Sequence, residues 1–412
     1  PAGRMSPPDL TRVRDVLRRL SAMMTDPTLS ARTAAMLRGE IACPELEIPH
    51  MTKNTVQTTV RLPAELVRRL EKMEATMGKD PALAAFRKGL VVREALTAAE
   101  PRNAQLQRDV AVSLDSIARV LLASRDRSGA LDALRRGLST RLALVSCNPG
   151  NSHLQRDLSL SHNRIGDVLL NGDDREAALD AYRRGFAIAE ALAALDPANT
   201  EWQRDLSVSY EKLGDAQSEL GNRSEALDAF GSCLGIRENL VAHDRNNVQW
   251  QHDLSIIHAK VGDELQAQGD GPGALTAYRK SLAIAEAVTA RNPTNTEWQR
   301  NLAVSHNRIG DMLLAQRDMP GTLAHYRESL EIAEALTERD RTNAEWQRDL
   351  IVSLGKLSAV TGDRTCVARA LEIAKSMQAR GILAPRDAWT VSYTHLRAHE
   401  TDSYLVCRLL LE

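Results

Sequence analysis

An internal repeat of 48 residues is the sequence feature that most constrains the fold. Each copy begins with a four-residue motif: Leu or Trp, then Gln, then Arg or His, then Asp or Asn. The six copies begin, without drift in spacing, at Leu106, Leu154, Trp202, Trp250, Trp298 and Trp346. A fixed period of this length is typical of stacked supersecondary units that bury their hydrophobic faces against their neighbours.

Each repeat is predicted to form two helices joined by a short turn. An Asn, such as Asn199, stands three residues before each motif, where its side chain can cap a helix N-terminus. Apolar residues then follow at steps of three and four, and a second helix begins after the turn at Gly221. We expect the first helix to bury Trp202, Leu206, Tyr210, Leu213, Gln217 and Leu220. We expect the second helix to bury Ala226, Phe230, Leu234 and Leu240.

A glycine recurs inside the first helix of four repeats, at Gly166, Gly214, Gly262 and Gly310. A glycine in the middle of a helix costs about 1 kcal/mol relative to alanine. Its recurrence in register therefore predicts that a neighbouring helix packs closely at this position.

The pattern Leu213-Gly214, Gly221, Ala226 and Phe230 resembles the tetratricopeptide repeat. The unit is longer than is usual in that family, and its WQRDL opening resembles a long-repeat bacterial subgroup. The resemblance implies an all-α fold, a right-handed superhelical solenoid of antiparallel helix pairs. It also implies that the first helices line a concave surface that receives protein or peptide partners.

The repeat register predicts the domain boundaries. The tetratricopeptide-like array is expected to cover residues 79–385. It consists of a half unit followed by six units that begin at 103, 151, 199, 247, 295 and 343. The last first-helix is expected to be shorter than the others, as in a capping repeat. Residues 386–412 are predicted to be a non-native tail, because residues 391–412 resemble a translated sequencing adapter, and the chain is interpreted as a metagenomic gene fragment.

The N-terminal residues leave several interpretations open. Residues 1–50 are uncharacterised and expected to be mostly helical or disordered. Residues 51–78 resemble the opening of ribbon-helix-helix DNA-binding proteins, in which the outward face of a short strand reads bases. Alternation would place Gln57, Thr59 and Arg61 on that face. The same residues also fit a diverged first helix of the repeat, or a chimaera joined to the array.

The composition gives no sign of a membrane, nucleic-acid or metal-binding protein. Lys and Arg number 53 against 54 Asp and Glu, so the net charge of -1 exerts no general attraction on nucleic acid or anionic lipid. The five cysteines form no CxxC pair, which fits a reduced, cytoplasmic protein. A histidine column, His162, His258 and His306, is interpreted as packing because Leu and Tyr also occupy it. We expect no catalytic, metal or cofactor-binding residue.

One polar column is the candidate binding site. Asp167, Asp215, Asp263 and Asp311 each follow the helix glycine directly, off the predicted buried stripe. The neighbouring candidates are Asn163, Glu211 and Asn307. The column is either a solvated face with local hydrogen bonds, or a mildly acidic groove that receives a basic or polar segment.

Two functions follow from these observations. The first is a non-enzymatic scaffold or adaptor that binds a protein or peptide partner on its repeat surface. The alternative is a transcriptional regulator with a ribbon-helix-helix head and a sensing array, which would bind nucleic acid.

Overall fold

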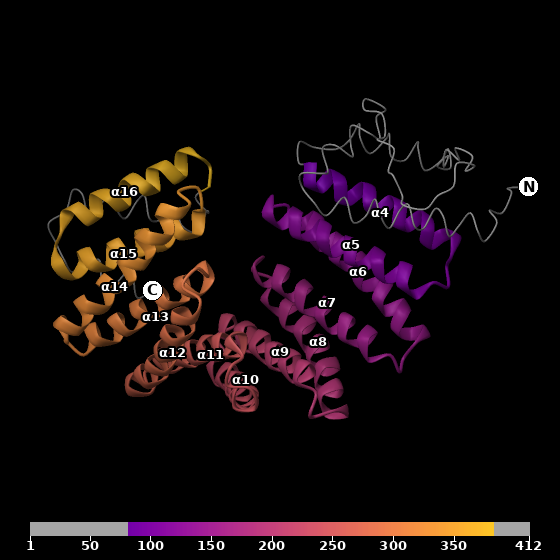
Figure 1. The fold of residues 1–412 in the computed structure, drawn as a ribbon, viewed down its shortest axis with the longest axis horizontal. Coiled ribbons are helices and arrows are strands. Elements are labelled where there is room, and N and C mark those ends of the chain that lie inside the picture. Colours follow the sequence, from indigo (N-terminus) through magenta and orange to yellow (C-terminus); the bar gives the residue numbers. More distant parts are fainter. Residues whose placement is uncertain (1–80, 383–412) are drawn as a thin grey trace, which may run out of the picture. The chain divides into compact units, whose positions relative to one another are not determined.

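The computed structural model describes residues 81–382, which form thirteen helices of 16–21 residues and no strand (Figure 1). The first helices of the repeats, called helices A here, are α5 (Ala104–Ala123), α7 (Ser152–Leu170), α9 (Thr200–Glu219), α11 (Val248–Ala267), α13 (Thr296–Ala315) and α15 (Ala344–Thr361). The second helices, called helices B, are α4 (Pro81–Ala99), α6 (Arg127–Cys147), α8 (Arg175–Leu195), α10 (Arg223–His243), α12 (Gly271–Arg291), α14 (Met319–Arg339) and α16 (Arg364–Ala379).

The helices form two compact units, and the division between Ile188 and Ala189 falls within α8. In the first unit, α5 packs against α4 and α6, and α6 packs against α7. In the second unit, each helix from α10 to α15 packs against the helices before and after it. The predicted all-α array of tetratricopeptide-like helix pairs is therefore confirmed for the described residues. The candidate DNA-reading residues Gln57, Thr59 and Arg61, and the tail at 386–412, lie outside them.

The predicted Asn residue caps the N-terminus of all six helices A. In each, the Asn side chain accepts a hydrogen bond from the backbone N–H three residues later, as Asn247 does from Trp250. The turn after helix A has a left-handed backbone, with a φ of 81° at Gly221 and 86° at Gly269. Arg125, Asp173 and Arg317 also have a positive φ at this position, of 61–63°, although a side chain makes it less favourable.

The glycine column lies where helix A meets helix B of the same repeat. A Cβ atom added to Gly262 would lie 2.5 Å from the ring of Tyr278, a separation that no side chain could tolerate. The same contact joins Gly166 to Tyr182, Gly214 to Phe230 and Gly310 to Tyr326. The prediction of a closely packed neighbour is therefore confirmed, and the neighbour is an aromatic ring that is 1–2% exposed.

The predicted core is confirmed in helix B and wrong in part in helix A. In α10, Ala226, Phe230 and Leu240 are buried and Leu234 is half-buried. In α9, all six residues of the predicted stripe are half-buried. The buried residues there are Ser207, Ser209, Gly214 and Ala216. Small side chains lie at the closest approach of the helices, so the larger ones are pushed towards the margin of the contact. The shortening of the last helix A is confirmed, since α15 has 18 residues and α9 has 20.

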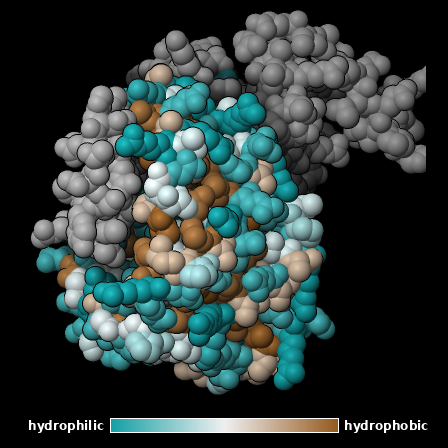
Figure 2. Space-filling view, turned by 90° about the vertical axis from the view of Figure 1, so that its left-hand side faces the viewer, coloured by the Kyte–Doolittle hydropathy of each residue, from teal (hydrophilic) through white to brown (hydrophobic). Residues whose placement is uncertain are grey.

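The surface mixes hydrophobic and hydrophilic residues. Figure 2 shows one face on which hydrophobic residues gather in the middle and hydrophilic residues surround them. Half-buried Leu330, Leu357 and Ile373 pack against the buried cluster of α14–α16. Between residues 81 and 382, no helix combines the length and the apolar character that crossing a membrane requires.

Two glycines in helices A provide a matched test of the glycine–aromatic contact. Gly310→Ala places a methyl group 2.4 Å from the buried Tyr326 ring, so we expect a loss of about 1–3 kcal/mol in the free energy of unfolding. Gly355 lies in α15 with no atom within 4 Å of an added Cβ, so Gly355→Ala should stabilise by about 0.5–1 kcal/mol. Urea unfolding measures both changes. Equal effects of the two substitutions would show that the contact does not require glycine.

Candidate functional site

The Asp that follows the helix A glycine accepts a hydrogen bond from the tyrosine that covers that glycine. The Tyr278 hydroxyl donates to Asp263 Oδ1 at 2.8 Å. Burial raises the pKa of the Tyr278 hydroxyl, and the Asp263 carboxylate raises it further, so this hydroxyl stays a donor. The equivalent bonds are Tyr182 to Asp167 at 2.8 Å and Tyr326 to Asp311 at 2.6 Å. Each of these Asp side chains therefore ties helix A to helix B of its own repeat.

In the second compact unit, the same Asp column also binds a cation from the next helix A. Arg308 donates two hydrogen bonds to Asp263, at 2.8 and 2.6 Å. Lys356 binds both oxygens of Asp311, at 2.6 and 2.7 Å. The cations also lie over the aromatic rings: Lys260 over Phe230 at 5.8 Å, Arg308 over Tyr278 at 6.0 Å and Lys356 over Tyr326 at 5.7 Å. Each cation therefore links two successive repeats.

These contacts argue against the interpretation of the Asp column as an open acidic groove. Asp215, Asp263 and Asp311 each form an ion pair with a Lys or Arg of the next repeat. A carboxylate that is already paired attracts a further cation only weakly, because the field of its partner cancels most of its own. The basic column Lys260, Arg308 and Lys356, spaced by 48 residues, is the sequence signal that would have revealed the pairing.

Among the candidate residues, Glu211 forms ion pairs with two different cations. Its carboxylate pairs with Arg237 of α10 and, at 3.0 Å, with Lys260 of α11. Burial by itself would raise the pKa of Glu211, but the attraction of Lys260 and Arg237 outweighs it and lowers the pKa to about 2. Arg237 is 3% exposed and also donates to the backbone oxygen of Asp253 at 2.7 Å. Glu211 thus neutralises a buried cation.

The buried arginine and its acid vary together among the repeats. Arg141 of α6 pairs with Asp115 of α5, as Arg237 pairs with Glu211. Helices α8, α12 and α14 carry Ala at this position, at Ala189, Ala285 and Ala333. Their helices A carry the neutral residues Asn163, Ala259 and Asn307. Among these five repeats, an acid is therefore present in this column only where an arginine must be neutralised.

The repeated motif itself builds a second link between repeats. Its Arg pairs with the Asp of the next copy, as in Arg204–Asp253 at 2.9 Å. The same pair occurs as Arg108–Asp157 and as Arg300–Asp349. Where the motif has His252, the next copy has Asn301, and the two side chains hydrogen-bond at 2.7 Å. The third residue of the motif in one repeat thus meets the fourth residue of the motif in the next, which explains why both recur along the chain.

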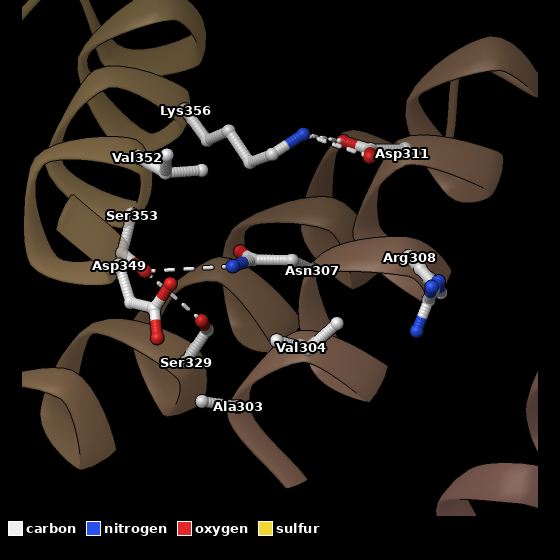
Figure 3. A pocket seen from close by; sticks show the side chains of 10 residues that line it. All are labelled: Ala303, Val304, Asn307, Arg308, Asp311, Ser329, Asp349, Val352, Ser353 and Lys356. Atoms are coloured by element: carbon white, nitrogen blue, oxygen red, sulfur yellow. Dashed lines mark hydrogen bonds and ion pairs between the residues drawn. The ribbon is translucent and has the colours of Figure 1, made fainter. Parts of the chain in front are cut away.

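A cavity of about 200 Å³ lies between α13 and α15, over Ser329 of α14 (Figure 3). Asn307 and Ser353 face each other across it, and the Asn307 Nδ2 donates to Ser353 Oγ at 3.4 Å. The other lining residues are Ala303, Val304, Arg308, Asp311, Asp349, Val352 and Lys356. Two predicted site residues, Asn307 and Asp311, therefore meet at one hollow of the helix A surface.

The remaining predicted residues occupy other places. Asn163 lies against α8, with its Oδ1 beside Gly185. The histidine column is buried, as predicted: His162, His258 and His306 are 5–8% exposed. Burial lowers the pKa of His258 and His306 to about 4, with a smaller contribution from Lys280 and His325 respectively. Within the part of the chain that the structure describes, no group of three His, Cys, Asp or Glu side chains could hold a metal ion.

A double-mutant cycle tests the buried pair. Glu211→Ala leaves Arg237 buried without its acid, so we expect a loss of roughly 3–5 kcal/mol in the free energy of unfolding. Adding Arg237→Ala recreates the Ala259 and Ala285 combination that the chain already uses. The double variant should therefore be less destabilised than the sum of the single variants, with a coupling of about 1–3 kcal/mol. Additive losses would contradict the pairing.

The pH dependence of the same coupling has a definite sign. The folded pKa of Glu211, about 2, lies below its ordinary value of 4.5. The ion pair of Glu211 therefore stabilises the fold fully at a pH above 4.5, the ordinary pKa of the carboxyl group. This stabilisation is lost as the pH falls towards about 2, the pKa of Glu211 in the folded chain. Urea titrations of the cycle at decreasing pH should show the coupling shrinking over that window. A coupling that has vanished by the ordinary pKa would overturn the assignment.

Asp263→Asn tests whether the Asp column is structural. The substitution keeps the shape but removes the charge that Arg308 binds, so we expect a loss of about 1 kcal/mol in the free energy of unfolding. Asp180→Asn is the matched control, because the Asp180–Arg184 pair on α8 is more than 60% exposed on both sides. If both variants unfold like the wild type, Asp263 does not hold the repeats together.

Comparison with known proteins identifies the fold only. No family model matches the sequence, and no curated protein matches it. Among solved structures, aspartyl phosphate phosphatase F from Bacillus subtilis aligns with a TM-score of 0.52 at 12% identity, over 84% of this chain and 87% of that one. A tetratricopeptide repeat protein from Parabacteroides merdae aligns with a TM-score of 0.42 at 14% identity, over 80% and 98%. BtubC from P. vanneervenii aligns with a TM-score of 0.46 at 17% identity, over 60% and 91%. At such identities the first alignment supports a tetratricopeptide-like helical fold, and the other two add no argument.

Proposed function

We propose that this chain is a scaffold or adaptor that binds a segment of a partner protein on the helix A surface of its repeats. One observation carries the proposal: a cavity opens between two helices A, α13 and α15, whose spacing is fixed by ion pairs on both sides of it. Arg300–Asp349 and Lys356–Asp311 are these pairs. A binding surface that is rigid before the partner arrives loses little conformational entropy on binding.

The fold fits this role. Stacked helical repeats present extended surfaces, and proteins of this architecture use them for binding. The charges on the helix A surface hold successive repeats together, so a partner meets a fixed pattern of side chains rather than a flexible one. We propose that the Asp column sets the spacing of the helices and that the partner contacts the hollows between them. The sequence alone suggests the Asp column as an acidic groove for a basic partner. The structure favours this less, because Asp215, Asp263 and Asp311 are already paired with cations of the next repeat.

The remaining features of the proposed function come from the sequence. We propose that the protein has no catalytic activity and needs no cofactor, and that it acts in the cytoplasm. The DNA-binding alternative depends on Gln57, Thr59 and Arg61, which lie outside the described residues, and no described contact favours it.

Selection of short random peptides on the immobilised full chain tests the proposal. We expect enriched peptides whose binding is lost in Val352→Arg, because the bulky cation obstructs the cavity between α13 and α15. The stem of the arginine fills the cavity while its guanidinium reaches solvent from this half-buried position, so the fold should persist, and circular dichroism verifies it.

The matched control changes the outer face of helix B. Arg279→Ala and Arg327→Ala remove exposed cations from α12 and α14 and should leave peptide binding unchanged. If these variants abolish binding and Val352→Arg does not, the partner binds helix B and the proposed surface is wrong. If no peptide is enriched on the wild type, the scaffold function itself is contradicted.

A further inference from the structure

Each helix A carries one aliphatic residue within a mostly polar face. It lies six residues after the start of the motif and is Val, Leu or Ile in all six repeats. In the second compact unit these residues, called the aliphatic row here, are Val208, Ile256, Val304 and Val352. We infer that the aliphatic row receives an extended, uncharged segment of the partner in which every third residue is aliphatic. This inference rests on the proposed function and deepens it, because it names the chemistry that the surface recognises.

The aliphatic row does not belong to the hydrophobic core. Its four side chains are half-buried, and Val112, at the same position of α5 in the first unit, is 51% exposed. Half-buried Leu302 and Leu357 pack against the buried clusters of α12–α16, and Val304 and Val352 are not among the residues that do so. The position three residues later varies between Asp, Asn, Glu, Ala and Gly, so repetition alone does not keep a residue aliphatic.

Two rows of ion pairs border the aliphatic row, one on each side. Figure 3 shows this on α15, where Val352 lies between Lys356, which pairs with Asp311, and Asp349, which pairs with Arg300. The rows continue as Lys260–Asp215 and Arg308–Asp263 on one side and as Arg204–Asp253 on the other. Because each of these charges already has its counter-charge, an incoming charged side chain would lose hydration and gain little attraction. The surface therefore favours an uncharged segment.

The cavity between α13 and α15 lies within the aliphatic row. Val304 and Val352 line it from the two helices, and Ala303 adds a further apolar wall. Its volume of about 200 Å³ is below the range of about 300–1,000 Å³ that small-molecule sites occupy, so it has room for a side chain of a bound segment. An aliphatic side chain placed there removes apolar surface of both valines from water, which is favourable in proportion to the area covered.

The width between the ion-pair rows fits an extended chain and not a helix. Arg300 and Arg308 of α13 are eight residues apart, which is about 12 Å along a helix, and Val304 lies halfway between them. A helix with its side chains is about 10–12 Å across, so it would lie on the charged side chains without reaching Val304. An extended backbone needs about half that width, since neighbouring strands lie about 4.7–4.9 Å apart.

The separation of successive helices A determines the spacing of the partner's aliphatic residues. Ion pairs join these helices, and helices in contact lie about 8–10 Å apart. A polyproline II segment makes one turn in three residues and advances about 9 Å in that turn. Every third side chain of such a segment therefore points to the same side, with a spacing that matches the aliphatic row.

The test uses peptides selected on the full chain and counter-selected on Val352→Arg. We expect the peptides that distinguish the two to carry aliphatic residues at every third position. A synthetic peptide of this set is compared, by fluorescence anisotropy, with versions in which one of these residues is Ala or Asp. The Ala version should bind about tenfold more weakly, because less apolar surface is covered, and the Asp version at least as weakly. Raising the salt concentration should leave the affinity unchanged, because screening acts on charges.

Three substitutions in the chain locate the binding. Val304→Thr keeps the shape but replaces a methyl group with a hydroxyl, so the peptide should bind roughly three- to tenfold more weakly. Val304→Ile introduces the residue that Ile256 already supplies in the row, so binding should persist. Leu195→Thr is the control, because Leu195 is 74% exposed at the end of α8 and lies outside the row. Urea unfolding verifies that all three variants are folded.

The outcomes separate this inference from the proposed function. Peptides that Val352→Arg blocks but that are indifferent to Val304→Thr would overturn the inference alone. So would selected peptides that share charged residues and lose affinity in salt, or aliphatic residues spaced alternately by three and four, which is the pattern of a helix. An equal loss of binding in Leu195→Thr would show that the peptides bind any exposed aliphatic residue, which also contradicts it. The absence of any enriched peptide would overturn the proposed function with it.

Discussion

The contact between a helix A glycine and an aromatic ring of helix B determines the rest of the architecture. Only a glycine lets the ring lie against the helix backbone, as at Gly262 and Tyr278. The close approach places the tyrosine hydroxyl within 2.8 Å of the Asp that follows the glycine. It also exposes the face of the ring to the cation of the next repeat, which binds the same Asp. One steric requirement thus positions a packing contact, a hydrogen bond and an ion pair.

The polar residues of helix A belong to a system of matched pairs. Glu211 accompanies Arg237, and the motif Arg of one repeat accompanies the motif Asp of the next. The chain changes both members together, as the His252–Asn301 pair illustrates. A lone change would bury a charge or a polar group without a partner, which is much less favourable than losing the pair as a whole. The surface that remains for binding is the set of hollows between the paired residues.

The fold could be predicted from the sequence because residues 48 positions apart have the same structural role in successive repeats. The capping Asn, the helix glycine and the buried Ala226 and Phe230 could each be identified from their columns. The role of the Asp column was missed because its cationic partners lie 45 residues away on the next helix A, as Lys356 does from Asp311, and only the 48-residue spacing of those cations indicates the pairing. The cavity at Asn307 also escaped prediction, since it depends on which side chains of α13 and α15 leave space between them.

The joint at His252 and Asn301 has a consequence for the evolution of the gene. Tandem repeats of equal length are prone to lose or gain a copy by unequal recombination. Most copies could be exchanged without harming the motif link, because each supplies an Arg at one end of the joint and an Asp at the other. Loss of the copy that begins at 247 would instead bring Arg204 against Asn301, a cation facing a neutral amide. The copies that carry His252 and Asn301 are therefore less readily separated than the others.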